Sequence, residues 1–400
     1  MKNDATVIGL ISFAHGMSHF FQLLLAPLFP FIREELGVSY AALGFLVALF
    51  YTLSALFQPL AGFVVDRYGA RSVLFGGIAF FVAGTALMGV STDYAMLAVG
   101  AALTGIGNSV FHPADFAILN ARVSPRRLGY AFSAHGVVGY LGYAVAPAFS
   151  VPIAAFYGWH AALLGGAALG VALLVLLVLH SRYLHIEPHP RKRGASFATD
   201  ARVLFAWPVV LCFLYFTLFA GGLAGLQSFG VSALVEQYKV AATAASSALT
   251  AYLVSAAAGI LAGGFVAARA SRHGLVAASG LAVNAFAILL VAMGLVPNAA
   301  LPLALAVAGF ASGMVAPSRD LIVRASTPKG AEGRVFGFVY SGLDVGSFAM
   351  PVFYGWMLDH AMPHAVFYVV FAFTAGAIAT VLQLPGRSVG VADPAAVKKT

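Results

Sequence analysis

Residues 62–71 read GFVVDRYGAR and form a short charged stretch between two long apolar runs, 40–65 and 72–91. A helix of about 20 apolar residues is long enough to cross the hydrocarbon core of a bilayer. The Asp and the two Arg of this stretch would be costly inside hydrocarbon, so we expect them at the membrane surface. The stretch therefore indicates a tight loop that joins two membrane-spanning helices.

Apolar runs of this length recur along all 400 residues. The chain is 61% hydrophobic and only 9% charged, whereas soluble proteins carry roughly 25% charged residues, so this surface cannot face water. The runs are long and continuous, unlike barrel strands, and only helices satisfy their own backbone in lipid. We therefore expect an all-α membrane protein with twelve transmembrane helices, at 6–32, 40–65, 72–91, 94–118, 129–154, 160–181, 204–234, 243–267, 274–295, 299–323, 333–358 and 364–384.

The basic residues predict how the chain is oriented. Nearly all of the 22 Lys and Arg fall at the termini or in the loops that share a side with them. The positive-inside rule then places both termini in the cytoplasm of a multi-pass protein, in a membrane of the bacterial inner type. The net charge of +8 thus reflects topology, and we expect no nucleic-acid partner. The first span is too long for a cleavable signal.

The longest loop divides the chain in two. We predict an N-terminal six-helix bundle at 1–181, a cytoplasmic linker at 182–203, and a C-terminal six-helix bundle with a short cytoplasmic tail at 204–400. Cys212 is the only cysteine, so no intramolecular disulfide forms.

The two halves repeat each other. A shift of 204 residues superimposes glycines and prolines of the first half on the same residues of the second: Gly105 on Gly309, Pro113 on Pro317, Gly142 on Gly346 and Pro147 on Pro351. Glycine and proline set backbone geometry, so their repetition predicts two pseudo-symmetric bundles. Parallel repeats of six helices are typical of secondary transporters, whose substrate site lies near the midplane between the halves.

Ionisable side chains inside the spans are the main candidates for function, because the bilayer makes them costly. Histidine changes charge near neutral pH and suits proton transfer. The candidates for proton coupling are His15, His19, His112, Asp115, His135 and Asp344.

His15 and His19 are four residues apart and share one helix face. They could form a hydrogen-bonded pair that packs helices, line a cavity that carries protons or binds an anion, or bind a metal. We favour the cavity and expect no resident metal. Gly16 stands where the HExxH metalloprotease motif needs Glu, which disfavours an enzyme of that class.

Pro113 removes one backbone hydrogen bond and is expected to kink its span beside the central cavity. His112 and Asp115 lie three apart, so they share a face next to this kink. We expect the cluster to take a proton on one side and release it on the other. The alternative is a role in packing alone.

Asp115 and Arg319 occupy equivalent positions in the two repeats. We hypothesise that they pair across the halves when the cytoplasmic side closes. Alternatively, Arg319 pairs locally and supports its span, or it binds an anionic substrate through its guanidinium group. Asp320 points about 100° away on the helix and should not share that role. Asp344 faces either the cavity or the second span.

Neutral polar residues in the spans serve more often to pack helices than to bind ligands. With that alternative open, the candidates for substrate binding or gating are Arg319, Asp320, Gln22, Asn108, Gln227 and Tyr340.

The opening stretch resembles the G-x-x-x-D-R-x-G-x-[RK] motif of the major facilitator superfamily. The resemblance implies a cytoplasmic gate made by Gly62, Asp66, Arg67, Gly69 and Arg71, with the acid near the N-terminal end of the eleventh span. We also expect Gly62 to allow close helix approach. The equivalent stretch 263–274 has Ala268 in place of the acid.

Residues 105–120, GIGNSVFHPADFAILN, resemble a stretch of the fosmidomycin-resistance branch of this superfamily. That branch tends to carry Glu directly after the Pro, where this chain has Ala114 followed by Asp115. Residues 136–149, GVVGYLGYAVAPAF, resemble the G-x-x-x-G-P motif of drug–proton antiporters, with Ala146 in place of the second Gly.

These features predict a proton-coupled secondary transporter that works by alternating access and exports a small anionic or amphipathic compound. The alternative is proton-coupled import of a small organic acid, siderophore or metal chelate. The chain lacks the G-x-x-x-x-G-K-[ST] motif of nucleotide-binding loops, and no nucleophile–base set indicates an enzyme. We expect no cofactor. The expected partners are the substrate, protons and the lipid bilayer, and the expected state is a monomer.

Overall fold

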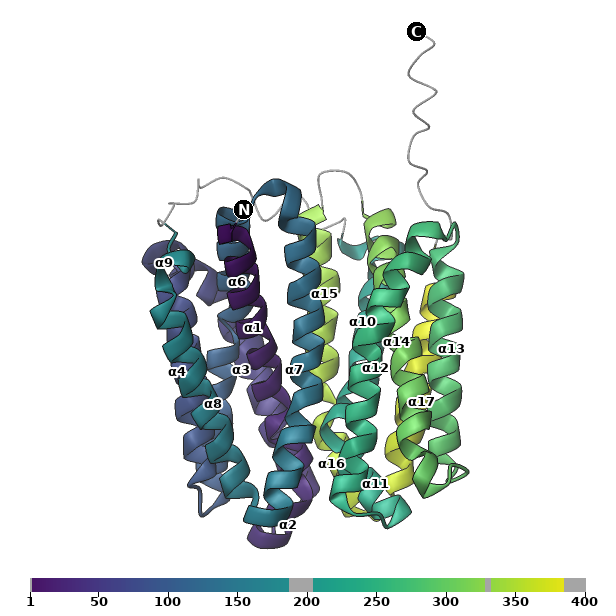
Figure 1. The fold of residues 1–400 in the computed structure, drawn as a ribbon. Helices are drawn as coiled ribbons and strands as arrows, with labels where there is room; N and C mark the ends of the chain where they lie inside the picture. Colours follow the sequence, from purple (N-terminus) through teal and green to yellow (C-terminus); the bar gives the residue numbers. More distant parts are fainter. Residues whose placement is uncertain (1, 187–203, 328–331, 385–400) are drawn as a thin grey trace.

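The structure is a computed structural model that describes residues 2–186, 204–327 and 332–384. Its helices run along one another in a single bundle of two halves (Figure 1). Within the described residues, 11 helical segments are long and apolar enough to cross a membrane, and no strand is present. The predicted all-α membrane fold is therefore confirmed. Most of the predicted linker, 187–203, lies outside the described residues.

The N-terminal half begins with the helix that carries His15. Its helices are α1 (Lys2–Leu24), η1 (Ala26–Leu28), α2 (Phe29–Leu36), α3 (Tyr40–Tyr68), α4 (Ala70–Gly89), α5 (Tyr94–Asn108), α6 (Phe111–Arg122), η2 (Pro125–Arg127), α7 (Leu128–Tyr157), α8 (Trp159–Leu179) and α9 (Ser181–Leu184). The longest of them match the predicted apolar runs to within a few residues.

The C-terminal half repeats this order with different interruptions. Its helices are α10 (Trp207–Ala224), the π-helical turn η4 (Gly225–Phe229), α11 (Gly230–Tyr238), α12 (Ala242–Arg269), α13 (His273–Ala292), η5 (Asn298–Ala300), α14 (Leu301–Ala325), α15 (Glu332–Ala349), α16 (Pro351–Asp359) and α17 (Pro363–Leu382).

The structure divides the predicted span 333–358 into two helices. It consists of α15 and α16, which are separated at Met350 and carry Asp344 in the first part. Pro351 follows the break and has no N–H to continue the helical ladder. This broken pair takes the place of the eleventh predicted span, before α17.

The repeated prolines act differently in the two halves. The chain breaks between α5 and α6, just before Pro113, whereas Pro317 lies inside the continuous helix α14. Conversely, Pro147 lies inside the continuous helix α7, while Pro351 begins α16. The helix is interrupted just before Pro113, where a kink was expected, and the positions of the helix breaks do not repeat between the halves.

Helix pairing and glycine contacts do repeat. Helices α1 with α7, α3 with α5 and α4 with α8 correspond to α10 with α15, α12 with α14 and α13 with α17. A Cβ at Gly105 would overlap the backbone of Phe50, and a Cβ at Gly309 would overlap the backbone of Tyr252. Both glycines therefore permit close approach at equivalent helix crossings.

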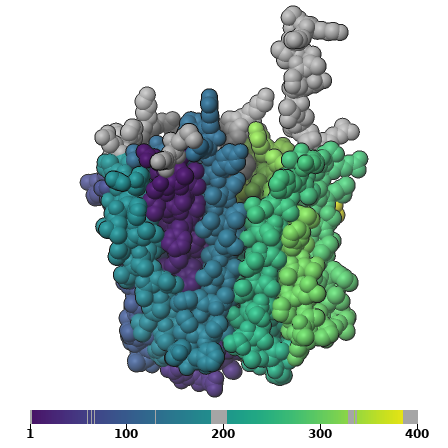
Figure 2. Space-filling view, in the orientation of Figure 1, coloured from purple at the N-terminus to yellow at the C-terminus, as the bar shows by residue number. Residues whose placement is uncertain are grey.

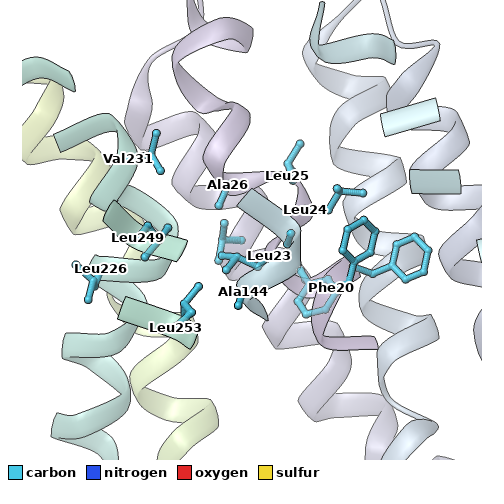
Figure 3. Packing of buried hydrophobic residues seen from close by; sticks show 14 of the residues in the cluster. Phe20, Leu23, Leu24, Leu25, Ala26, Ala144, Leu226, Val231, Leu249 and Leu253 are labelled. Atoms are coloured by element: carbon cyan, nitrogen blue, oxygen red, sulfur yellow. The ribbon is translucent and has the colours of Figure 1, made fainter. Parts of the chain in front are cut away.

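The halves meet through α7 against α12 and through α3 against α15 and α16. Helices α7 and α12 lie side by side on the face seen in Figure 2. Buried apolar side chains join the halves, and Figure 3 shows Leu23 and Ala144 opposite Leu249 and Leu253. The Ser246 hydroxyl also donates to the Pro147 carbonyl at 2.8 Å.

One polar contact ties the halves together at the end of the bundle opposite the start of α1, called here the distal end. Both carboxylate oxygens of Asp359, at the end of α16, accept backbone hydrogen bonds from the first turn of α3. Tyr40 donates at 2.7 Å and Ala41 at 2.8 Å. A carboxylate at a helix N-terminus satisfies unpaired N–H groups and the positive end of the helix dipole.

The outer surface is apolar, as a lipid-facing surface must be. Large hydrophobic side chains are exposed on both halves, including Phe45, Leu164, Leu261 and Phe286. A belt of this kind is unfavourable in water and stable in hydrocarbon.

Candidate transport site

Four histidines and one aspartate gather in the N-terminal half, and we call this group the His–Asp cluster. Helix α1 supplies His15 and His19, α6 supplies His112 and Asp115, and α7 supplies His135. The spacings of four and three residues bring each pair to one helix face, as predicted. The third helix, α7, adds its histidine from across the bundle.

The centre of the cluster is the Asp115 carboxylate. Its Oδ2 lies 3.2 Å from Nε2 of His135 and 3.5 Å from Nδ1 of His15. The two imidazole rings stack with their centroids 3.5 Å apart and an angle of 15° between the planes. Asp115 is fully buried, and both histidines are 4% exposed.

The other two histidines surround this centre. The ring of His19 lies 4.4 Å from that of His15, and the ring of His112 lies 5.3 Å from it. Gly139 of α7 makes room for them, because a Cβ there would come within about 3 Å of the rings of His15 and His19. His112 is the exposed member of the cluster.

The cluster has an unbalanced electrostatic environment. Within the described residues, Asp115 forms no ion pair with Lys or Arg, and its Oδ1 has no hydrogen-bond partner. An ionised buried carboxylate is strongly unfavourable without a positive partner. Two stacked imidazolium rings would repel each other. The arrangement is therefore suited to holding one shared proton between the acid and its histidines.

A chain of polar side chains leads away from the cluster. The ring of His19 lies 4.2 Å from that of Tyr143, whose hydroxyl donates to Gln22 Oε1 at 2.6 Å. Gln22 Nε2 donates to Asn108 Oδ1 at 2.9 Å, and Asn108 Nδ2 donates to Ser54 Oγ at 2.7 Å. Gln22 and Asn108, both predicted candidates, are thus direct partners of each other.

Asp344 of the C-terminal half lies near this series of polar side chains. It is partly buried on α15 and lies within electrostatic range of Tyr51 of α3 and Tyr143 of α7. Asp344 therefore lies near both the second span, through Tyr51, and the polar side chains beside the His–Asp cluster, through Tyr143.

A second group, the Arg–Asp cluster, lies in the C-terminal half. Arg319 Nε donates to Asp320 Oδ1 at 2.9 Å, and the Tyr340 hydroxyl donates to the same oxygen at 2.9 Å. The guanidinium also lies over the ring of Phe216, 4.8 Å from its centroid. The Arg319 side chain is 14% exposed and that of Asp320 is 44% exposed.

In this structure Arg319 pairs locally with Asp320, which is the alternative given above, and a pair with Asp115 when the cytoplasmic side closes stays a prediction. Asp115 itself pairs with histidines. Although successive helical residues point about 100° apart, the Arg319 side chain is long enough to turn back to its neighbour. Asp320 therefore takes part in the same cluster.

Other predicted residues lie apart from both clusters. Gln227 is buried in the π-helical turn η4, and its Nε2 has no hydrogen-bond partner among the described residues. A Cβ at Gly62 would meet no heavy atom within 4 Å, so the expected close helix approach there is wrong for this structure.

The rest of the cytoplasmic motif lies where α3 turns into α4. Gly69 has φ of +84° and ends α3, a conformation that favours glycine. Arg67 is exposed with its guanidinium 5.4 Å from the ring centroid of Tyr68, and Arg71 is in the first turn of α4. The side chain of Asp66 lies outside the described part of the chain.

Sequence patterns missed several members of the site. Ser54 and Tyr51 lie three residues apart on the inward face of α3, a spacing that could have indicated a polar face in that apolar run. Phe216 gave no signal, because an aromatic residue in a span is ordinary. Asp359 gave no signal either, since its partners are 319 and 318 residues away.

Two pseudo-symmetric bundles of membrane-spanning helices, each with ionisable groups inside it, are typical of a membrane transporter. The model of the Major Facilitator Superfamily matches residues 11–232 and again 212–398. The chain belongs to this superfamily, as the stretch GFVVDRYGAR indicated. The family is one of transporters and not of enzymes, which confirms that prediction.

Relatives and solved structures agree with this assignment. The chain is 28% identical to the fosmidomycin resistance protein of Escherichia coli (strain K12) over 294 residues, which cover 71% of this chain and 70% of that protein. It is 29% identical over 178 residues to a multidrug resistance protein B homologue of Mycobacterium tuberculosis, with 44% of this chain and 31% of that protein covered.

The fold matches the nucleoside transporter NupG with a TM-score of 0.78, 15% identity and coverage of 94% of this chain and 99% of NupG. A bacterial homologue of the human lysosomal transporter Spinster gives 0.73 at 14% identity, with 94% and 96% covered.

Proposed function

We propose that this transporter exports a small anionic or amphipathic compound in exchange for protons. It would act by alternating access in an inner membrane, with both termini in the cytoplasm. The observation that carries the proposal is the buried Asp115 carboxylate, whose ion-pair partners among the described residues are His135 and His15. A buried group that must be neutralised by a proton, with the exposed His112 beside it, can couple proton movement to a conformational change.

The chain of contacts from His19 through Tyr143 to the neighbourhood of Asp344 supports coupling between the halves. A change in the charge of the His–Asp cluster would alter the partners of α7. Since α7 packs against α12 of the other half, its movement would be transmitted to the interface.

Closure of the distal end supports alternating access. The Asp359 carboxylate on the first turn of α3 joins the halves there. The resemblance of residues 62–71 implies the same kind of contact at the opposite end, from Asp66 in the last turn of α3 to the start of α15. Two contacts of this kind would favour closure of one end at a time.

The Arg–Asp cluster supports an anionic substrate. Arginine has five N–H donors, and the bond to Asp320 Oδ1 uses Nε. A carboxylate or phosphonate could bind the remaining donors and compete with Asp320 for the cation. Two relatives named for resistance favour export of such a compound.

The test uses purified protein in liposomes that enclose a pH-sensitive dye. A proton gradient is imposed, and fosmidomycin, organic anions, phosphonates and amphipathic drugs are added in turn. We expect one of them to drive proton flux with the wild type and at least a 100-fold smaller flux with Asp115→Asn, which keeps the shape of the side chain.

His364→Gln, an exposed histidine outside both clusters, is the matched control and should retain full flux. The direction of proton movement relative to substrate separates export by antiport from import. Flux that survives Asp115→Asn unchanged would show that coupling does not pass through the His–Asp cluster.

A further inference from the structure

The centre of the His–Asp cluster has the donor set of a metal site. His15 Nδ1, Asp115 Oδ2 and His135 Nε2 come from three helices and lie within 4.8 Å of one another. Ligand atoms around a tetrahedral Zn²⁺ are about 3.4 Å apart, because each bond is about 2.1 Å long. The two distances to Asp115 Oδ2, 3.5 Å and 3.2 Å, already fit such an edge.

Unpartnered atoms inside the cluster also point to a ligand. His15 Nδ1, His19 Nδ1 and Asp115 Oδ1 are buried side-chain atoms that have no hydrogen-bond partner among the described residues. Buried polar atoms normally have partners, so each exception needs an explanation. A bound cation would satisfy the nitrogen lone pairs and balance the carboxylate at once.

The surrounding histidines can complete the coordination and give access. His19, with its ring 4.4 Å from His15, is the nearest source of a fourth ligand. His112 lies on the exposed side, 5.3 Å from His15, and would receive an ion that enters from water. The stacked rings of His15 and His135 would tilt relative to each other on binding, because a metal lies in the plane of each imidazole and the planes are now only 15° from parallel.

We propose that His15, Asp115 and His135 bind one divalent transition-metal ion of the Zn²⁺ type. Two imidazoles and one carboxylate suit Zn²⁺ and Co²⁺ better than Mg²⁺ or Ca²⁺, which prefer oxygen ligands. The ion binds the same atoms that would hold the coupling proton, so metal and protons exclude each other. Binding itself does not depend on the proposed function, and inhibition of flux by the metal does.

The test titrates purified protein with Co²⁺, whose visible absorption becomes intense in tetrahedral coordination. We expect one equivalent to bind, Zn²⁺ to displace it, and the affinity to fall as the pH is lowered through the range where histidine takes up protons. Asp115→Asn and His135→Ala should each weaken binding at least tenfold, while His364→Gln should leave it unchanged.

Thermal unfolding of each variant checks that a loss of binding is not a loss of fold. The absence of a tetrahedral Co²⁺ band in the folded wild type, or equal affinity in wild type and Asp115→Asn, would overturn the proposal. Proton flux measured without metal reports on the proposed function alone. The metal-site proposal and the proposed function can therefore fail independently of each other.

Discussion

The two halves place different chemistry at the same repeat position. In the N-terminal half, Asp115 is fully buried and its partners are histidines, which gain and lose protons near neutral pH. In the C-terminal half, Arg319 is permanently charged and pairs with Asp320, whose side chain is 44% exposed. Equivalent positions in the repeat thus carry a buried acid with histidine partners in one half and an arginine–aspartate ion pair in the other.

This comparison is tested most strongly by removing one partner from each acid. His135→Gln deletes the nearest imidazole of the buried Asp115, and Tyr340→Phe deletes one hydrogen bond to the more exposed Asp320. We expect coupled proton flux to fall about 100-fold in the first variant, the scale of a lost acid–base group. The second should lose about tenfold or less, the scale of one hydrogen bond.

Both variants are assayed in the dye-loaded liposomes at equal protein content. Equal losses in the two variants would show that the halves do not differ in the way proposed.

The next largest effect is expected at the cation of the C-terminal half. Arg319→Gln removes the charge that holds Asp320 and is available to an anion. We expect the KM for an anionic substrate to rise about tenfold or more, because a hydrogen bond to a charged group contributes about 1.5–3 kcal/mol. The maximal proton flux at saturating substrate should change much less.

The measurement is flux as a function of substrate concentration. Arg269→Gln is the control, since that exposed arginine at the end of α12 donates to the Phe265 carbonyl of its own helix. An unchanged KM in Arg319→Gln would show that Arg319 supports the structure of α14 and does not bind the substrate.

Sequence patterns predicted the parts of this comparison that depend on local spacing. Long apolar runs gave the spans: the run predicted at 160–181 is α8, Trp159–Leu179. The i, i+4 spacing of His15 and His19 predicted a shared face, and their rings are 4.4 Å apart. These features follow from helix geometry alone.

Contacts between distant segments could not be predicted in the same way. His135 meets Asp115 because α7 crosses α6, and the crossing depends on packing along the entire helix. The Arg319 side chain points back to Asp320. A long side chain has several rotamers, and sequence spacing does not determine which one it adopts. The Asp359 contact with Tyr40 joins residues 319 apart, so no local pattern contains it.

A smaller effect is expected at the contact that joins the halves at the distal end. Asp359→Asn keeps the shape but removes the charge from the first turn of α3. A charge at a helix N-terminus contributes about 1 kcal/mol, so the population open at the distal end should rise about fivefold. Spin labels at Glu34→Cys and Asn298→Cys, in a Cys212→Ser background, report the separation of the halves there.

Asp93→Asn is the matched control, because Asp93 caps the N-terminus of α5 within one half. It should lower stability without changing the label distances. If both variants shift the distances alike, or neither does, Asp359 has no special role in joining the halves.

The smallest expected effect tests whether the repeat is equal at the ends of α3 and α12. A Cβ at Gly62 or at Gly264 would meet no heavy atom within 4 Å. Each Gly→Ala change should therefore leave the fold intact and stabilise its helix by up to about 1 kcal/mol, as measured by thermal unfolding.

The two helix ends differ in the residue four positions later, which is Asp66 after Gly62 and Ala268 after Gly264. If the cytoplasmic end closes on α3, as its motif implies, Gly62→Ala should slow transport severalfold and Gly264→Ala should not. Equal transport by both variants would mean that Gly62 stays open to solvent or lipid throughout the cycle, and the asymmetry between the halves would then be confined to the buried clusters.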